Sequence, residues 1–182
     1  MMSDELDMDV RLDVLNSALI LERDINNILI ELFNLSKDET KVFSYSSNNF
    51  SFQQKILLLK DLKHLSSSDY SSLDLFMQFR NQFMHNYYAN SFEYVVKVIN
   101  RKNELLKFNK NASIHNSDEL LYFSCFKNLV IHNITIVHNV FKKVYKDKIA
   151  EIKINLSEAN LRTENEYLKK IEQIFFETIK IL

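Results

Sequence analysis

Apolar residues recur at helical spacing along most of the chain, and polar breaks divide this pattern into segments. The first segment covers residues 10–35, where leucines and isoleucines repeat every three or four positions. A break rich in serine and asparagine follows at residues 36–49. This pattern predicts a long amphipathic first helix that ends before the break.

Two capping sequences predict where the next helices begin. Ser51 and Gln54 have capping-box spacing at the start of one apolar run, and the sequence SSSD at residues 66–69 precedes another. We therefore expect a second helix from about Ser51 and a third helix over residues 66–87. The apolar face of the third helix is expected to hold Leu73, Phe76, either Phe79 or Arg80, and Phe83.

The second half of the chain predicts three further helices. One helix is expected over residues 92–108, a long one over 119–150 after a polar break at 109–118, and a last one from Asn155 or Ser157 to the end. The stretch LVIHNITIVHNV inside the long segment is rich in β-branched residues, which favour a strand by propensity. The three-four periodicity on both sides of it favours a helix.

The composition supports an all-α fold. The chain has no glycine and no proline, so its turns must use Asn, Ser, Asp and Lys, which suit connections between helices better than tight hairpins. The same absence excludes glycine-rich phosphate loops and dinucleotide fingerprints. We expect an antiparallel helical bundle over residues 1–108 and a C-terminal helical extension over 109–182, packed on the same domain.

Charge and cysteine content limit the function classes and the compartment. The formal net charge is −1, from 23 basic and 24 acidic residues, which argues against a protein that coats nucleic acid without specificity. The acidic N-terminus MMSDELDMDV lacks the features of a secretory signal, and no apolar run is long enough to span a bilayer. We predict a cytoplasmic protein without a membrane segment. Cys125, the only cysteine, is expected to be a core residue.

The sequence FRNQFMHNYY, residues 79–88, places unusual polar groups at the end of the third predicted helix. Asn81 and His85 are four residues apart and share a helix face. Arg80 and His85 are five apart, so their directions diverge by about 140°. The two side chains can meet only if the helix ends or bends near His85, or if a second copy of the helix faces the first across a two-fold axis.

These residue types suit the cleavage of RNA without a metal ion. The arginine fork matches a phosphate or its transition state, and histidine can take or give a proton near neutral pH. His132 and His138 are six residues apart, which is not a helical spacing for metal ligands. We expect no metal site and no cofactor. His64 and His115 fall in polar breaks and are expected at the surface.

The motif resembles that of a known family. Arg80 to Tyr87 reads R-x4-H-x-Y, which is similar to the signature of the HEPN superfamily in the form found in toxins paired with a nucleotidyltransferase antitoxin. The preceding segment LLLKDLKHLSSSDYSSLDLFMQFRN is similar to the apolar helix, short break and motif helix of that family. The stretches RDINNILIELF and FSFQQKILLLKDL also resemble mannitol operon repressor-like members. The resemblance covers about residues 10–108.

The resemblance implies a fold, an activity and a role for each residue. It implies a helical bundle that forms a homodimer through the motif helix, with both motifs in one cleft. Active members are metal-independent endoribonucleases in toxin, phage-defence or RNA-processing systems. By position, Arg80 would stabilise the phosphate, His85 would act as general acid or base, and Asn81 would orient the substrate or His85. Tyr87 matches the tyrosine that partner nucleotidyltransferases modify with AMP.

Other interpretations of the same residues remain open. Arg80 also suits a surface or interface salt bridge, and His85 suits the C-terminal end of a helix, where the macrodipole favours a cation. The alternative function is a catalytically inactive, HEPN-like regulatory or antitoxin-type module that binds protein. Direct DNA binding is disfavoured, because no helix-turn-helix with a basic recognition helix is evident.

Overall fold

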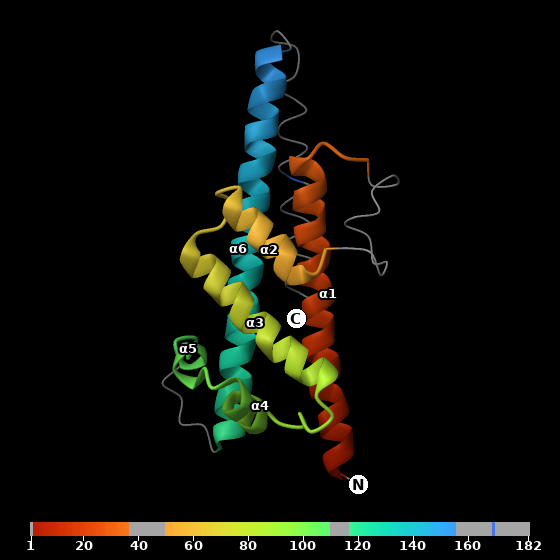
Figure 1. Ribbon diagram of the computed structural model, residues 1–182, viewed down its shortest axis with the longest axis vertical. Coiled ribbons are helices and arrows are strands. Elements are labelled where there is room, and N and C mark those ends of the chain that lie inside the picture. Colours follow the sequence, from red (N-terminus) through yellow and green to blue (C-terminus); the bar gives the residue numbers. More distant parts are fainter. Residues whose placement is uncertain (1, 37–49, 110–116, 156–168, 170–182) are drawn as a thin grey trace.

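Two long helices, α1 (Met2–Leu32) and α6 (Asp118–Asn155), form the long axis of the protein in the computed structural model (Figure 1). The structure describes residues 2–36, 50–109, 117–155 and 169. All elements within this described part are α-helices, which confirms the all-α prediction. The first helix begins earlier than the apolar pattern indicated.

The two long helices run in the same direction. Lys127 pairs with Asp13 at 3.0 Å near one end, and Lys148 pairs with Glu31 at 2.8 Å nearer the other. Residue numbers therefore increase along both helices together. Helix α3 (Ser67–His85) packs on both and runs diagonally across the pair in the opposite sense, from α6 toward α1 (Figure 1).

Helices α2 (Phe52–Asp61) and α3 begin at the two predicted capping boxes. The Ser51 hydroxyl accepts the Gln54 N–H at 3.3 Å, and the Gln54 side chain accepts the Ser51 N–H at 2.8 Å. Ser66 and the aspartate three residues later make the same reciprocal pair. These bonds satisfy N–H groups that have no partner inside their own helix. The two helix starts are thus set by local sequence.

The predicted helix over residues 92–108 is wrong as a single element. The structure has α4 (Phe92–Ile99) and α5 (Lys102–Leu106), separated by Asn100. Asn100 adopts a left-handed conformation with φ 57°, and its N–H bonds to the Val96 carbonyl. Asparagine tolerates this conformation better than most residues other than glycine. It therefore takes the C-capping role in a chain that has no glycine.

Arg101 holds the two short helices against α3. Its guanidinium bonds to Asp74 of α3 at 2.7 Å and pairs with Glu104 through both carboxylate oxygens. The hydrogen bond from Arg101 holds the pKa of Glu104 below its ordinary value, and the same bond raises the pKa of Arg101. The bend after α4 is thus fixed by charge-assisted hydrogen bonds.

The strand alternative for the β-branched stretch is also wrong, because this stretch lies in the middle of α6. From Asp118 to Ala150, α6 is long and apolar enough to cross a membrane by length and composition. Half of its most apolar window is buried inside the protein, against α1, α3, α4 and α5. A core helix passes the same test, and this packing accounts for the apolar character of α6.

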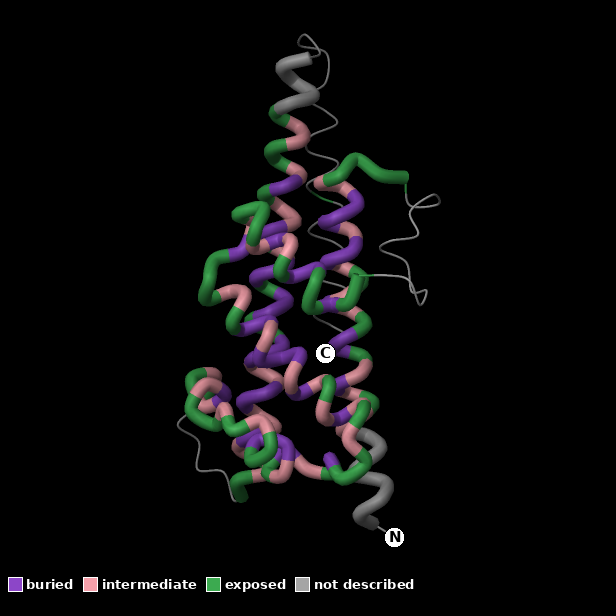
Figure 2. The backbone as a smooth tube through the Cα atoms, viewed as in Figure 1, coloured by how far each residue is buried: buried purple, intermediate pink, exposed green. Residues whose placement is uncertain are grey.

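The core is built on a cluster of phenylalanines where α3, α4 and α6 meet. Buried positions run along the facing sides of these helices (Figure 2). Ring centroids lie 5.6 Å apart between Phe79 and Phe126, and 4.9 Å apart between Phe83 and Phe92. Aromatic pairs at such distances add to the free energy gained by burial. Cys125 is fully buried among them, which confirms its expected core role.

Some predicted features fall outside the described residues. These are the last helix from Asn155 or Ser157 onward and most of the polar breaks at 36–49 and 109–118. The part of the 109–182 segment that the structure describes as helix α6 packs along α1 and α3. The division at residue 109 stays a prediction.

One buried polar pair fixes α3 against α6. The Ser72 hydroxyl donates to Asn133 Oδ1 at 2.7 Å, and Asn133 Nδ2 donates back to the Ser72 carbonyl at 3.3 Å. Asn133 is fully buried and Ser72 nearly so. A one-turn slip of α3 would leave these groups without partners in an apolar core, which is unfavourable. The pair therefore selects one register.

We expect Asn133→Ala to lower the free energy of unfolding by about 2 kcal/mol, because it leaves the buried Ser72 hydroxyl unpaired. Urea denaturation of the variant beside wild type measures this difference. Asn139→Ala is the matched control, since Asn139 lies exposed on the same helix. Equal stability losses in the two variants would contradict a register role for the buried pair.

Candidate functional site

The site lies at the C-terminal end of α3, where the helix stops at His85. Asn86 follows in an extended conformation with φ −100° and ψ 113°, so the helix cannot continue. The Asn86 N–H still bonds to the Gln82 carbonyl and closes the last turn. The predicted end at residue 87 was two residues too late.

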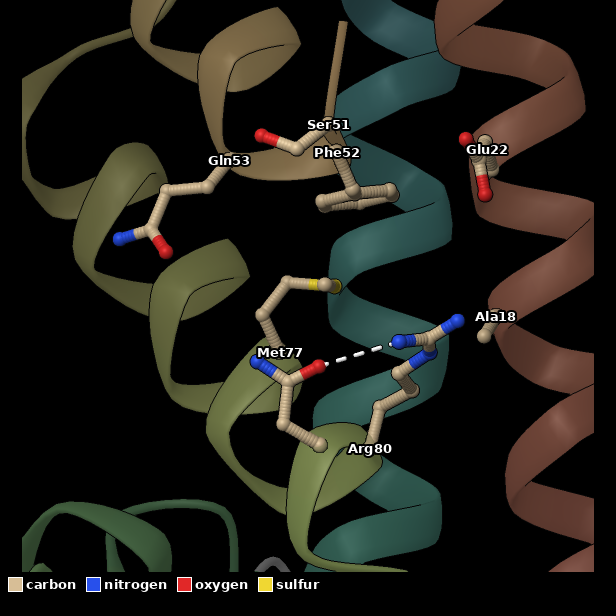
Figure 3. A pocket seen from close by; sticks show the side chains of 8 residues that line it. Ala18, Glu22, Ser51, Phe52, Gln53, Met77 and Arg80 are labelled. Carbon is tan, nitrogen blue, oxygen red and sulfur yellow. Dashed lines mark hydrogen bonds between the residues drawn. The ribbon is translucent and has the colours of Figure 1, made fainter. Parts of the chain in front are cut away.

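The structure brings Arg80, Asn81 and His85 together within one chain. Arg80 Nη1 donates to Asn81 Oδ1 at 3.1 Å, a contact drawn in Figure 3, and lies 3.4 Å from His85 Nε2. A guanidinium can only donate, so this contact requires a lone pair on His85 Nε2. Of the two arrangements that the spacing allowed, the helix end at His85 is therefore sufficient for contact.

The motif faces solvent. Asn81 and His85 are exposed, while Arg80 is half-buried. The next two aromatic residues are more exposed still: Tyr87 is 88% exposed and Tyr88 is 70% exposed, with ring centroids 5.5 Å apart. Two neighbouring aromatic side chains this exposed form a small apolar surface that a ligand or partner could contact. The arrangement leaves the arginine, the histidine and both tyrosines accessible to a macromolecule.

A residue that the sequence analysis missed, Arg11 of α1, holds the segment that follows His85. Its Nη1 donates to the Phe83 carbonyl at 2.9 Å, and its Nη2 donates to the Ala89 carbonyl at 2.9 Å. Nη2 also lies 3.3 Å from the carbonyls of Asn86 and Tyr87. One side chain thus satisfies carbonyls that the end of α3 leaves without helical partners.

Asn86 completes the turn that presents the tyrosines. Its Oδ1 accepts the Tyr88 N–H at 3.0 Å, and its Nδ2 donates to Gln82 Oε1 at 2.9 Å. The side-chain oxygen of Asn86 takes the place of a backbone carbonyl in this turn, which therefore needs no glycine. Ala89 is fully buried and anchors the far side of the turn. The turn is therefore held at both ends while its two aromatic rings project outward.

A pocket opens beside the motif, where α1, α2 and α3 meet (Figure 3). Its volume is about 280 Å³, and Arg80 and Asn81 form part of its wall. The remaining lining residues are Ala18, Glu22, Ser51, Phe52, Gln53 and Met77. Nothing in the sequence marked Glu22 or Gln53 as neighbours of Arg80, because they come from other helices. The motif therefore borders a preformed cavity.

One residue of the pocket wall, Glu22, belongs to an ion pair. Lys55 is fully buried, and its Nζ donates to Glu22 Oε1 at 2.7 Å. A buried ammonium without a partner is strongly unfavourable, so Glu22 is needed to keep Lys55 inside. The Glu22 side chain is 24% exposed, because its carboxylate also faces the pocket. Among the described residues that line the pocket, Arg80 is the only one with a positive charge.

A second pocket of about 340 Å³ lies between the ends of α1, α2 and α6. His64 lines it together with Asp147 and Lys148. His64, expected at the surface, is half-buried. Burial, reinforced by the nearby Lys143, lowers the pKa of His64 from its ordinary value. His64 Nδ1 is buried, and no hydrogen-bond partner for it is found in the described part of the protein.

In the described part of the protein, the other histidine and cysteine candidates do not form a reactive or metal-binding cluster. His132 is exposed and packs on Phe108, with ring centroids 5.3 Å apart. Burial raises the pKa of the Cys125 thiol, which favours the unreactive protonated form. Within the described ranges, no group of three or more His, Cys, Asp or Glu side chains could hold a metal ion. His115 lies outside those ranges.

Comparison with known proteins finds no relative for this chain. No protein-family model matches it, and no curated protein or solved structure matches it significantly. The HEPN resemblance therefore rests on the residues of the motif and of the segment that precedes it.

We expect Arg11→Ala to loosen the turn after α3 and to lower the free energy of unfolding by about 2 kcal/mol, because the carbonyls it binds lose a charged donor. Limited digestion with chymotrypsin should then cut faster after Tyr87 or Tyr88 than in wild type. Arg23→Ala is the control, because it removes an exposed arginine from the same helix. An unchanged cleavage rate in Arg11→Ala would show that the turn after α3 does not depend on Arg11.

We expect wild-type protein to lose stability as the pH falls below about 6.5, in part through His64. The folded state binds a proton at His64 less readily than the unfolded chain does, so acid favours unfolding. His64→Gln should reduce the loss of unfolding free energy between about pH 7 and about pH 5.5. Urea denaturation at each pH measures it, with His132→Gln as control. An identical pH dependence in wild type and His64→Gln would exclude this role.

Proposed function

We propose that this chain is a metal-independent endoribonuclease of HEPN type, and that Arg80 and His85 are its catalytic pair. The observation that carries the proposal is the 3.4 Å approach of Arg80 Nη1 to His85 Nε2 at an exposed helix end. Cleavage by a ribose hydroxyl uses a cation that stabilises the phosphoryl charge and a group that accepts the hydroxyl proton. Their position beside a pocket gives the RNA chain a place to bind.

The proposed reaction needs no external reagent. The ribose 2′-oxygen attacks the adjacent phosphorus, the bond to the 5′-oxygen of the next nucleotide breaks, and a 2′,3′-cyclic phosphate forms. A base removes the proton from the 2′-hydroxyl, and an acid supplies one to the leaving 5′-oxygen. Arg80 stabilises the negative charge that develops on the phosphoryl oxygens. Asn81 holds the guanidinium through its Oδ1 and so orients it.

Two proton transfers favour a homodimer. Each chain offers one His85 at this end of α3, and the reaction uses both a base and an acid. A two-fold axis beside the motif would place the second His85 on the other side of the scissile phosphate. The exposure of Asn81, His85 and both tyrosines leaves this face open to a second copy. The homodimer through the motif helix is part of the proposal.

The biological setting follows from the resemblance and is proposed with it. A ribonuclease of this kind acts in the cytoplasm as a toxin or a phage-defence component and needs a partner that silences it. The 88% exposure of Tyr87 supports its role as the site that a nucleotidyltransferase antitoxin would modify. Adenylation there would add a bulky anion two residues from His85, where it would repel an RNA phosphate.

A catalytically inactive, protein-binding module is the second proposal. Arg80 is half-buried and already contacts the Asn81 and His85 side chains, so the same geometry also serves to order the last turns of α3. The net charge of −1 gives the chain no general attraction for RNA. The two proposals differ in whether removal of the pair changes chemistry or only local stability.

We expect purified wild-type protein to cleave single-stranded RNA in the presence of EDTA and to leave 2′,3′-cyclic phosphate ends. Arg80→Ala and His85→Ala should each reduce the cleavage rate by at least about 100-fold, as expected for loss of a catalytic acid-base or charge-stabilising group. Gel electrophoresis of labelled RNA measures the rate. A substrate in which every 2′-hydroxyl is methylated should not be cut.

Arg23→Ala and His132→Ala are the matched controls, because they remove an exposed arginine and an exposed histidine elsewhere. Both should cleave like wild type. Inactivity of wild type on every RNA offered, or equal activity in the Arg80 and His85 variants, would remove the catalytic assignment. A protein complex that forms equally with wild type and the double variant would then support the inactive module.

A further inference from the structure

We propose that the pocket between α1, α2 and α3 binds a nucleobase of the RNA next to the scissile phosphate, and that guanine is the base it fits. This inference rests on the proposed ribonuclease function and names its substrate preference. The pocket has a volume of about 280 Å³, near the lower limit for ligand pockets, which suits a base better than a whole nucleotide. Arg80 forms part of its wall, so a base held there brings its own phosphate to the motif.

The apolar part of the pocket suits a flat ring. Phe52 and Met77 are 6% and 7% exposed, and both side chains border the cavity. Figure 3 shows them between Gln53 on one side and Glu22 on the other. Bases of single-stranded RNA are commonly bound by contact of their faces with aromatic or other apolar side chains.

The direction of each polar group is set by its partner. Gln53 Nε2 donates to Asp74 Oδ1 at 3.1 Å, and a carboxylate can only accept, so Gln53 Oε1 remains as an acceptor. Asn81 Oδ1 accepts from Arg80 at 3.1 Å, and a guanidinium can only donate, so Asn81 Nδ2 remains as a donor. The pocket wall therefore has defined acceptors and donors.

Glu22 supplies the strongest acceptor. One lone pair of its Oε1 is used by Lys55 Nζ at 2.7 Å, which leaves the other positions of the carboxylate for a ligand. The buried ammonium also offsets the negative charge of Glu22, so the carboxylate does not repel a phosphate that lies near Arg80. The ion pair thus makes an acceptor compatible with a polyanionic ligand.

Guanine matches this set better than the other bases. Its Watson–Crick edge has two adjacent donors, N1–H and the N2 amino group, which pair with a carboxylate, and an O6 acceptor for a donor such as Asn81 Nδ2. Cytosine and adenine offer an amino group beside an unprotonated ring nitrogen, which a carboxylate repels. Uracil offers one donor between two carbonyls. A bidentate pair of this kind discriminates between bases by about tenfold or more.

The test measures binding to the full chain without cleavage. The probes are short fluorescent 2′-O-methyl oligouridines that carry one guanine, adenine or cytosine, or none, and they lack the attacking hydroxyl. We expect the guanine probe to bind at least about tenfold more tightly than the all-uridine probe. Glu22→Gln should lose this preference, because the amide oxygen stays with Lys55 and its NH₂ group then faces the guanine donors. Equal binding of the four probes would overturn the proposal.

Two further variants separate base recognition from folding. Glu31→Gln alters a second glutamate–lysine pair of α1, nearer the C-terminal end of the helix, where the partly exposed Lys148 is the partner, and should keep the guanine preference. Gln53→Ala changes an exposed residue without touching the core and should weaken binding of the guanine probe severalfold. Loss of preference in Glu31→Gln, or full preference in both Glu22→Gln and Gln53→Ala, would contradict a pocket that reads the base.

The outcomes distinguish this inference from the proposed function. Cleavage of RNA without any base preference would keep the ribonuclease and overturn the guanine site. Guanine-selective binding without cleavage would keep the site and overturn the ribonuclease. Binding of free GMP is measured as well. If GMP binds as tightly as the guanine oligonucleotide, the pocket is a site for a free nucleotide and the assignment to RNA is overturned.

Discussion

The guanidinium of Arg11 is the interaction on which the site depends. It binds the carbonyls of residues 83, 86, 87 and 89, which belong to the last turn of α3 and the segment after it. In the described part of the protein, none of these carbonyls has a partner inside α3, and only the Asn86 carbonyl also accepts a backbone N–H, that of Ala89 at 3.1 Å. Because Arg11 comes from α1, the helix end that carries His85 is tied to one of the two long helices of the bundle. The position of His85 is therefore a tertiary property.

The rest of α3 is fixed in a similar way, by polar contacts inside an apolar frame. Asn133 and Ser72 set the register between α3 and α6, while Arg101 joins Asp74 to the α4–α5 bend. The phenylalanine cluster supplies free energy by burial but tolerates small shifts. The buried polar pairs do not, since each shift would leave a group unsatisfied. Together they hold Arg80 and the pocket wall in one arrangement.

The same side chains serve structure and the proposed chemistry. Glu22 keeps Lys55 inside the core and at the same time faces the pocket. Arg80 contacts the Asn81 and His85 side chains in the last turns of α3, and its remaining N–H groups stay available to a phosphate. A ligand would replace the contact between Arg80 and His85, releasing the Nε2 lone pair for proton transfer. Such a site is ordered before substrate binds, which reduces the entropy lost on binding.

The sequence by itself determined the helical class, the starts of α2 and α3, and the three residues of the motif. These follow from local physics: capping boxes act within four residues, the absence of glycine and proline is a property of composition, and periodicity reports a buried face. The break at Asn100 was missed because the adjacent apolar pattern continues through it, and a single left-handed asparagine leaves no periodic signal.

Only the tertiary structure decided how the site is assembled. Arg11 lies 72 to 78 residues from the carbonyls it binds, and Glu22 lies 33 residues from Lys55. No local pattern relates residues at such distances, because hydrogen bonds between separate helices depend on how the helices cross. The contact of Arg80 with His85 was undecided for a different reason: a spacing of five along a helix turns the two side chains apart, and only the structure shows that α3 ends at His85 and that the two side chains meet there.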